Sequence, residues 1–296
     1  MNTMAARPPR LNLRPAARSG DRLFTAWAKA TAAAAFFLLF AGGMVTSTGS
    51  GLAVPDWPLS FGGINPPMIG GIFFEHGHRL IAGCVALMAL GCVLLSRRSS
   101  VPSAARSAAN LAAGGILIQA LLGGLTVLLK LPPAVSISHA CLGQGVFCLL
   151  LASAILSVPD TVFGPGYSRV FRFATLGFAA AYLQLALGAL VRHTGQGLSW
   201  HILWASSVVV LWALAGFTAW RSHAPVLRGP ALLLAVAVPL QLGLGLFALL
   251  VRVDSTLVLG FREAAVWRTA HLSGGALTLA SFLLLALKSR RTAEHA

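Results

Sequence analysis

Long apolar runs separated by short polar segments dominate the chain. A membrane-spanning helix needs about 20 mostly apolar residues, because it crosses about 30 Å of hydrocarbon at about 1.5 Å per residue. Eight runs reach this length, at about residues 27–45, 78–96, 108–129, 137–157, 171–191, 199–219, 230–251 and 267–287. The pattern predicts an all-α integral membrane protein with eight transmembrane helices.

The composition agrees with this class and excludes others. The 296 residues are 57% hydrophobic and 10% charged, whereas soluble domains are about a quarter charged. The net charge of +15 has no large soluble surface to cover, which excludes a basic nucleic-acid-binding domain. The cysteines lie in apolar runs without CxxC spacing, so neither a disulfide-rich fold nor a zinc site is supported. We interpret them as small core residues: Cys84, Cys92, Cys141 and Cys148.

Charge also predicts the orientation, because short cytoplasmic loops retain Lys and Arg. With the N-terminus inside, sixteen of the 22 basic residues lie on the inner side, so both termini are expected to be cytoplasmic. The Arg-rich first 26 residues have some features of an organellar transit peptide. We favour a basic cytoplasmic tail.

An internal repeat predicts two pseudo-symmetric four-helix bundles. GGMVTSTGSGLA at 42–53 and GALVRHTGQGLS at 188–199 are identical at six of twelve positions. The expected parts are a tail at 1–26, an N-terminal half at 27–157, a cytoplasmic linker at 158–170, a C-terminal half at 171–288 and a tail at 289–296.

A second pattern places a glutamine four residues before a glycine in three odd-numbered helices, so that both share one helix face. The pairs are Gln119 with Gly123, Gln184 with Gly188, and Gln241 with Gly245; the first helix lacks the glutamine. Two interpretations stay open. One is a small-residue packing seam with an interhelical hydrogen bond, and the other is a slot beside a flat ligand.

Four histidines occupy equivalent positions, each predicted to start an even-numbered helix near the outer face: His78, His139, His201 and His271. Ionisable side chains at membrane depth are functional candidates by default. Within each half they form a pair, which suits the two axial ligands of a haem iron. Zinc would normally add carboxylate or thiolate ligands. We therefore expect two haem sites, and interpret the other histidines as solvated: His76, His193, His223 and His295.

The halves differ at Glu75, which lies one turn before His78, where the other half has Leu198. This carboxylate would place an acid–base group beside only one haem. The alternative is a salt bridge with Arg79 or Lys130. Candidate contacts for haem propionates are outer arginines, which would equally serve as lipid-headgroup anchors: Arg79, Arg192, Arg252 and Arg268.

Several ordered motifs resemble the heme A synthase family. They are EHGHRLIAG at 75–83, TGSGLAVPDWPLSFGG at 48–63, GGLTVLLKLPPAVSISHACLGQ at 123–144 and VRHTGQGLSWH at 191–201. The resemblance spans nearly all eight helices. It implies a bacterial inner-membrane oxidoreductase that converts the methyl group of haem O into the formyl group of haem A for terminal oxidases.

The resemblance also implies roles for particular residues. His78 and His139 would be substrate-haem ligands, Glu75 the catalytic carboxylate, and His201 with His271 the ligands of a haem b cofactor. Expected partners are membrane lipid, a haem O synthase that delivers the substrate and an electron donor that the sequence does not identify. Nucleic acid is not expected, and homo-oligomer formation is left open.

Two departures from the family pattern stand out. Many bacterial members carry a cysteine pair in the first outer loop, and this loop, at 46–74, has none. Many relatives have an arginine where the first helix ends, and here Thr46 takes its place. The route of electron entry is thus open.

Two other classes of function compete with the synthase. A non-enzymatic two-haem b-type cytochrome explains the four histidines but gives Glu75 no task. A transporter or haem-handling protein is suggested by the repeat, although no charged residue lies near the middle of a predicted helix and only Pro239 falls inside one.

Overall fold

The structure, a computed structural model, describes residues 19–158, 168–253 and 260–293. These residues form eight helices and no strand beyond one isolated β-bridge: α1 (Ser19–Ser47), α2 (Gly70–Ser96), α3 (Ser103–Leu128), α4 (Pro133–Leu156), α5 (Ser168–Thr194), α6 (Leu198–Arg221), α7 (Pro225–Val253) and α8 (Phe261–Ala293). Each helix is long and apolar enough to cross a membrane. The predicted all-α fold and number of spans are confirmed, and the chain is a multi-pass membrane protein.

The helices extend beyond the apolar runs that predicted them. Residues 19–26, expected in a tail, belong to α1, and α8 continues to Ala293. The prediction that His78 and His271 start their helices is wrong. His78 lies eight residues after Gly70, where α2 begins, and His271 lies ten residues after Phe261, where α8 begins. Hydropathy detects only the apolar part of a span. Polar residues at its ends stay helical because the helix satisfies their backbone groups.

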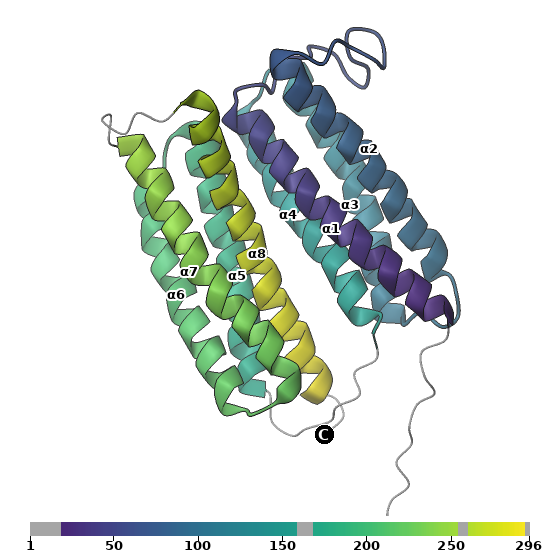
Figure 1. The fold of residues 1–296 in the computed structure, drawn as a ribbon, viewed down its shortest axis with the longest axis vertical. Coiled ribbons are helices and arrows are strands. Elements are labelled where there is room, and N and C mark those ends of the chain that lie inside the picture. The colour runs from purple at the N-terminus through teal and green to yellow at the C-terminus, as the bar shows by residue number, and fades with distance from the viewer. Residues whose placement is uncertain (1–18, 159–167, 254–259, 294–296) are drawn as a thin grey trace, which may run out of the picture.

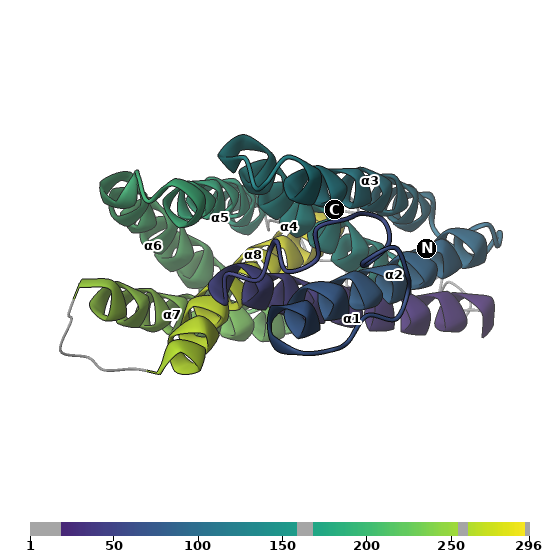
Figure 2. The same cartoon turned by 90° about the horizontal axis from the view of Figure 1, so that it is seen from above.

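The helices form two bundles that stand side by side (Figure 1). In the first, α1, α2, α3 and α4 pack in a closed ring, and α5, α6, α7 and α8 repeat the arrangement. The bundles meet where α8 contacts α1 and α4, and where α4 contacts α5. Seen from above, α4 and α8 lie near the centre (Figure 2). This is the two-bundle arrangement that the internal repeat predicts.

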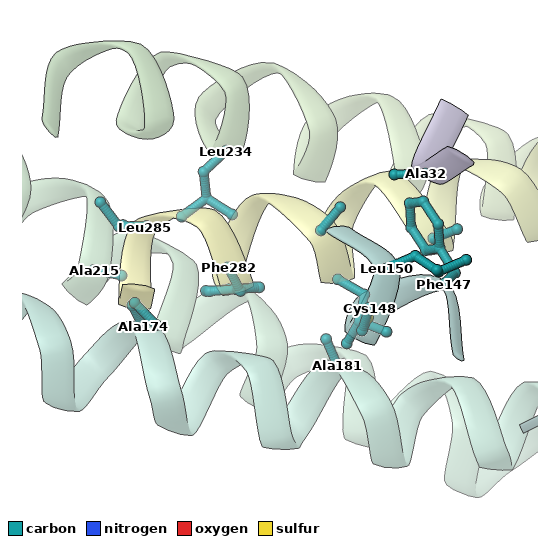
Figure 3. Packing of buried hydrophobic residues seen from close by; sticks show 14 of the residues in the cluster. Ala32, Phe147, Cys148, Leu150, Ala174, Ala181, Ala215, Leu234, Phe282 and Leu285 are labelled. Carbon is teal, nitrogen blue, oxygen red and sulfur yellow. The ribbon is translucent and has the colours of Figure 1, made fainter. Parts of the chain in front are cut away.

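The core between the bundles combines small residues with a few large ones (Figure 3). Phe147 and Leu150 of α4 belong to the same buried cluster as Ala181 of α5 and Phe282 of α8. The Phe282 ring occupies the space that a Cβ at Gly177 would need, so α5 and α8 approach closely. Such close approach is the main source of helix association in lipid.

The cysteines are all free, but they do not share one environment. Cys92 and Cys148 are buried, Cys141 is partly buried, and Cys84 is exposed. The interpretation as core residues is therefore wrong for Cys84, because its face of α2 has no helix packed against it.

Candidate functional site

Each of the four equivalent histidines lies against a glycine of the preceding helix. The pairs are His78 with Gly42, His139 with Gly123, His201 with Gly188, and His271 with Gly245. A Cβ added at these glycines would lie 2.9, 3.3, 3.0 and 2.8 Å from the Cε1 atom of the facing ring, in that order. The four rings therefore sit in one orientation in four equivalent helical hairpins. We call these glycines the histidine seats.

The glutamines complete the seats. Gln119 donates from Nε2 to the backbone oxygen of His139 at 2.9 Å, and Gln184 donates to that of His201 at 2.9 Å. Gln241 lies against the backbone of α8 at Gly275, four residues after His271. The glutamine–glycine pattern is thus a packing seam that receives a histidine. The interpretation as a slot beside a flat ligand is wrong, because the imidazole itself fills the space.

The histidines come together in the expected pairs. The ring centroids of His201 and His271 are 6.3 Å apart, with planes at 88°. His78 and His139 lie close enough to interact electrostatically. Nδ1 of all four rings is enclosed without a hydrogen bond of normal geometry, although the residues are only partly buried. Cε1 and Nδ1 are the ring atoms nearest the seat, and at His201 Nε2 lies 3.4 Å from Nε2 of Gln184.

This geometry fits a metal held between two imidazoles. Two metal–imidazole bonds of about 2 Å, plus about 1 Å from each nitrogen to its ring centre, require centroids about 6 Å apart. The observed 6.3 Å agrees. In the described part of the chain, His, Cys, Asp and Glu do not gather in groups of three or more. A haem iron brings four equatorial nitrogens and needs two axial ligands, which such a pair supplies.

Glu75 is buried beside the first pair, and both of its oxygens have partners. Oε2 accepts a hydrogen bond from the backbone N–H of Val54 at 2.8 Å, and Oε1 accepts one from Arg79 at 2.7 Å. The predicted alternative, a salt bridge with Arg79, is therefore present. The carboxylate both lies one turn from His78 and fastens the first loop.

Arg79 fastens the same loop through three backbone carbonyls. Nη1 donates to Asp56 at 2.8 Å and to Leu59 at 2.9 Å, and Nη2 donates to Val54 at 3.3 Å. Both terminal nitrogens of its guanidinium are thus used within the protein. Arg79 is a loop anchor in this structure, and its role as a propionate contact stays a prediction.

The first loop, residues 48–69, has no counterpart in the second half, where residues 195–197 connect α5 to α6. The indole of Trp57 lies against α3, since a Cβ at Gly124 would come within 2.7 Å of its Cδ2. Gly124 follows the seat of His139. The loop therefore crosses from α2 to α3 over the end of the first bundle at which α1 ends and α2 begins.

The turn at the tip of this loop is held by Asp56. Its carboxylate accepts hydrogen bonds from the backbone N–H of Phe61 and of Gly62, each at 2.7 Å. These bonds lower the pKa of Asp56 below its ordinary value of 3.8. Ser60, in the same turn, hydrogen-bonds Nδ1 of His76 at 2.8 Å.

His76 is consequently buried, so the prediction that it is solvated is wrong. Sequence periodicity places it off the face of His78 but does not show that a loop folds back over that other face. His193 lies in the last turn of α5, not in a loop, and is partly buried. His223 is exposed, as predicted, and His295 falls outside the described residues.

The remaining arginines differ in their surroundings. Nη2 of Arg192 donates to the backbone oxygen of Gly43 and to Ser47, both on α1. Arg252 donates to the backbone oxygen of Gly195 at 3.3 Å, and Arg268 is exposed. Their predicted contacts with propionates remain predictions.

Comparison with known proteins finds one matching family model and several similar proteins named heme A synthase. Residues 67–202, which include Glu75 and the first three of the four histidines, match the family model COX15-CtaA, described as cytochrome oxidase assembly protein. The heme A synthase of Geobacillus thermodenitrificans is 30% identical over 187 residues, which are 58% of this chain and 57% of that protein.

Two further relatives differ in the extent of the match. The heme A synthase of Geobacillus kaustophilus is 28% identical over 298 residues, covering 90% of this chain and 92% of its own length. A protoheme IX farnesyltransferase of Haloarcula marismortui is 29% identical over 127 residues, 43% of this chain and 27% of that protein. The chain thus spans less than two thirds of some relatives and nearly the whole of another.

Proposed function

We propose that the chain acts as the heme A synthases it resembles are named to act, by oxidising the methyl group of haem O to the formyl group of haem A. The product would serve the assembly of terminal oxidases. The observation that carries the proposal is the asymmetry between two otherwise equivalent histidine sites. Among the residues that the structure describes, the first site has a buried carboxylate and a covering loop, and the second shows neither.

This asymmetry supports different tasks for the two halves. We assign the substrate haem to His78 and His139, and a haem b cofactor to His201 and His271. A bound haem supplies an iron centre that exchanges electrons. Electron transfer alone needs two axial ligands and a rigid site, which the second half offers. Oxidation of a carbon also needs a group that handles protons or charge beside the reacting atom.

The protein side of the reaction follows from the contacts of the first half. The histidine seats fix the position of the four imidazoles, whose Nε2 atoms would bind the iron. Glu75 holds negative charge one turn from His78, where it would stabilise positive charge at the substrate carbon or accept a proton from it. The first loop, fastened by Glu75 and Arg79, would exclude water from the outer end of the site.

The test is Glu75→Gln, with haem O produced in the same cells. Gln keeps the shape of the side chain and an acceptor for the N–H of Val54 but removes the charge. We expect retained haem with accumulation of haem O or its alcohol in extracted pigments. The matched control is Glu263→Gln at the start of α8, whose carboxylate accepts a hydrogen bond from Gly260. Normal haem A production by Glu75→Gln contradicts the proposed role.

A second candidate function, a two-haem b-type cytochrome, is favoured by the equivalence of the four seats. It differs from the synthase in its pigments. Haem A in the extract supports the synthase, haem b alone supports the cytochrome, and a protein without haem contradicts both.

The cellular setting is part of the proposal. The bias of basic residues supports cytoplasmic termini in a bacterial inner membrane, with both histidine pairs near the outer face. Haem O would come from a haem O synthase through the lipid phase, and a separate donor would supply electrons.

A further inference from the structure

Arg192 joins the two halves of the molecule. It lies in the last turn of α5, in the second half, yet both hydrogen bonds of its Nη2 go to α1 in the first half. They reach the backbone oxygen of Gly43 at 2.8 Å and Oγ of Ser47 at 2.7 Å. The end of α1 is thus tied to the end of α5 by one side chain.

The same junction includes α8. Ser47 hydrogen-bonds Thr269 at 2.9 Å, and both side chains are buried. A Cβ at Gly43 would lie 2.8 Å from Cγ2 of Thr269. Three helices of the two halves therefore meet at Ser47, which hydrogen-bonds both Arg192 and Thr269.

This junction adjoins three of the four histidine seats. Gly43 follows Gly42, the seat of His78, and Arg192 lies one turn after Gly188, the seat of His201. Thr269 precedes His271 by two residues, and Arg192 interacts electrostatically with His271. A displacement of Arg192 would therefore change contacts beside the histidines of both halves.

The charge at this junction has no acidic partner among the described residues, where the ion pair found is that of Arg79 with Glu75. The groups that face Arg192 are a carbonyl, a hydroxyl, His271 and the like charge of Arg268. In the first half, the internal repeat places Thr46 at the position equivalent to Arg192, so no second cation stands there. The hydroxyl of Thr46 donates to the backbone oxygen of Gly42 in its own helix at 3.4 Å.

We propose that Arg192 is a positioning residue that couples the two histidine pairs, by fixing the seat of His78 against the second half and by supplying one positive charge shared by both iron sites. The proposal rests on the proposed function only in needing a haem iron in each half. A nearby positive charge stabilises the ferrous form, which carries one positive charge fewer, and so raises the reduction potential of each iron.

The test compares reduction potentials of the haem-loaded, full-length protein in three variants, measured by spectroelectrochemistry. Arg192→Met removes the charge and keeps most of the length, Arg192→Lys keeps the charge, and Arg262→Met removes an exposed charge from the first turn of α8. For Arg192→Met we expect the ferric–ferrous equilibrium of each haem to shift tenfold towards the ferric form. This corresponds to a fall of about 59 mV in each reduction potential for one electron. For the other two variants we expect little change.

A merely structural contact would lower stability without this shared shift. Unchanged potentials in Arg192→Met, a shift of only one haem, or an equal shift in Arg262→Met each overturns the proposal. Pigment extraction separates this result from the proposed function, since potentials are measurable whether or not haem A is formed.

A second measurement needs no haem. Hydrogen exchange at residues 43–48 of the haem-free protein reports whether the end of α1 is held. We expect faster exchange in Arg192→Met than in wild type and in Arg262→Met. Equal exchange in all three contradicts the coupling of the halves through Arg192.

Discussion

The imidazole of His271 lies so close to Gly245 that a Cβ at this glycine would come within 2.8 Å of Cε1. The glycine is therefore required by the position of the ring and not by the backbone, which is helical on both sides. The same relationship recurs in all four hairpins, so the absence of a side chain on one helix sets the place of a ligand on the next.

Gly245→Ala should consequently displace His271 and empty the second site. Overpacking costs about 1–3 kcal/mol, which exceeds the gain of up to about 1 kcal/mol when alanine replaces glycine in a helix. We expect loss of the second haem with the first retained, measured as haem per polypeptide and by the low-spin spectrum.

Gly243→Ala in the same helix is the matched control, because a Cβ there has no neighbour within 4 Å. It should bind haem fully and unfold at the same or a higher temperature. Full occupancy of the second site in Gly245→Ala would show that the ring moves aside at no cost.

The sequence predicted the helices, the repeat and the histidine pairs, because each leaves a signal at fixed spacing. The partnership between histidine and glycine leaves no such signal. The two residues are separated by 36, 16, 13 and 26 positions in the four hairpins, since the connecting loops differ in length. Only the packed structure shows that each glycine of the Gln–Gly pattern belongs to a histidine.

Contacts made by the first loop were equally hidden. His76 looked solvated because its burial depends on Ser60, sixteen residues earlier in an irregular segment. Glu75 illustrates the opposite case, in which two interpretations that seemed to compete describe one side chain. It lies beside a histidine of the site, and it pairs with Arg79.

Trp57→Ala should open the outer end of the first site. The indole packs against α3 at Gly124, and its removal leaves the loop without a contact on that helix. Because water would enter, we expect haem A production to fall about tenfold while the second haem stays bound. Susceptibility of residues 48–69 to protease should rise.

Gly124→Ala should reproduce this effect by pushing the indole outward, and Trp200→Ala should not, since Trp200 is exposed on α6. If Trp57→Ala produces normal amounts of haem A with a protease-resistant loop, the loop is not a cover for the site.

The turn held by Asp56 should respond to acid. The pKa of Asp56 is lowered by the hydrogen bonds from Gly62 and Phe61, so the carboxylate form is the one that stabilises the folded loop. That contribution is complete above the ordinary value of 3.8 and is lost as the pH falls through the lowered pKa. Hydrogen exchange in the loop should not change with pH near neutrality through Asp56, which stays ionised there, and should gain a protonation step only below about pH 4.

Asp56→Asn should remove this step and leave the loop looser at neutral pH, because one amide oxygen replaces the two carboxylate oxygens that bind Phe61 and Gly62. A pH step that persists in Asp56→Asn would assign the acid response to another group.

Arg79→Gln and Glu75→Gln should separate loop fastening from chemistry. Arg79→Gln removes the hydrogen bonds to the loop carbonyls and leaves a buried carboxylate without its cation, which costs about 3 kcal/mol for a buried pair. We expect a protease-sensitive loop and a lower unfolding temperature. Glu75→Gln keeps one acceptor oxygen, enough for the N–H of Val54, and leaves the bonds of Arg79 to the loop carbonyls in place. Its loop should therefore stay more closed than that of Arg79→Gln while haem O accumulates. If Glu75→Gln instead opens the loop as far as Arg79→Gln does, the carboxylate acts by holding the loop, and the charge beside His78 is not what the reaction requires.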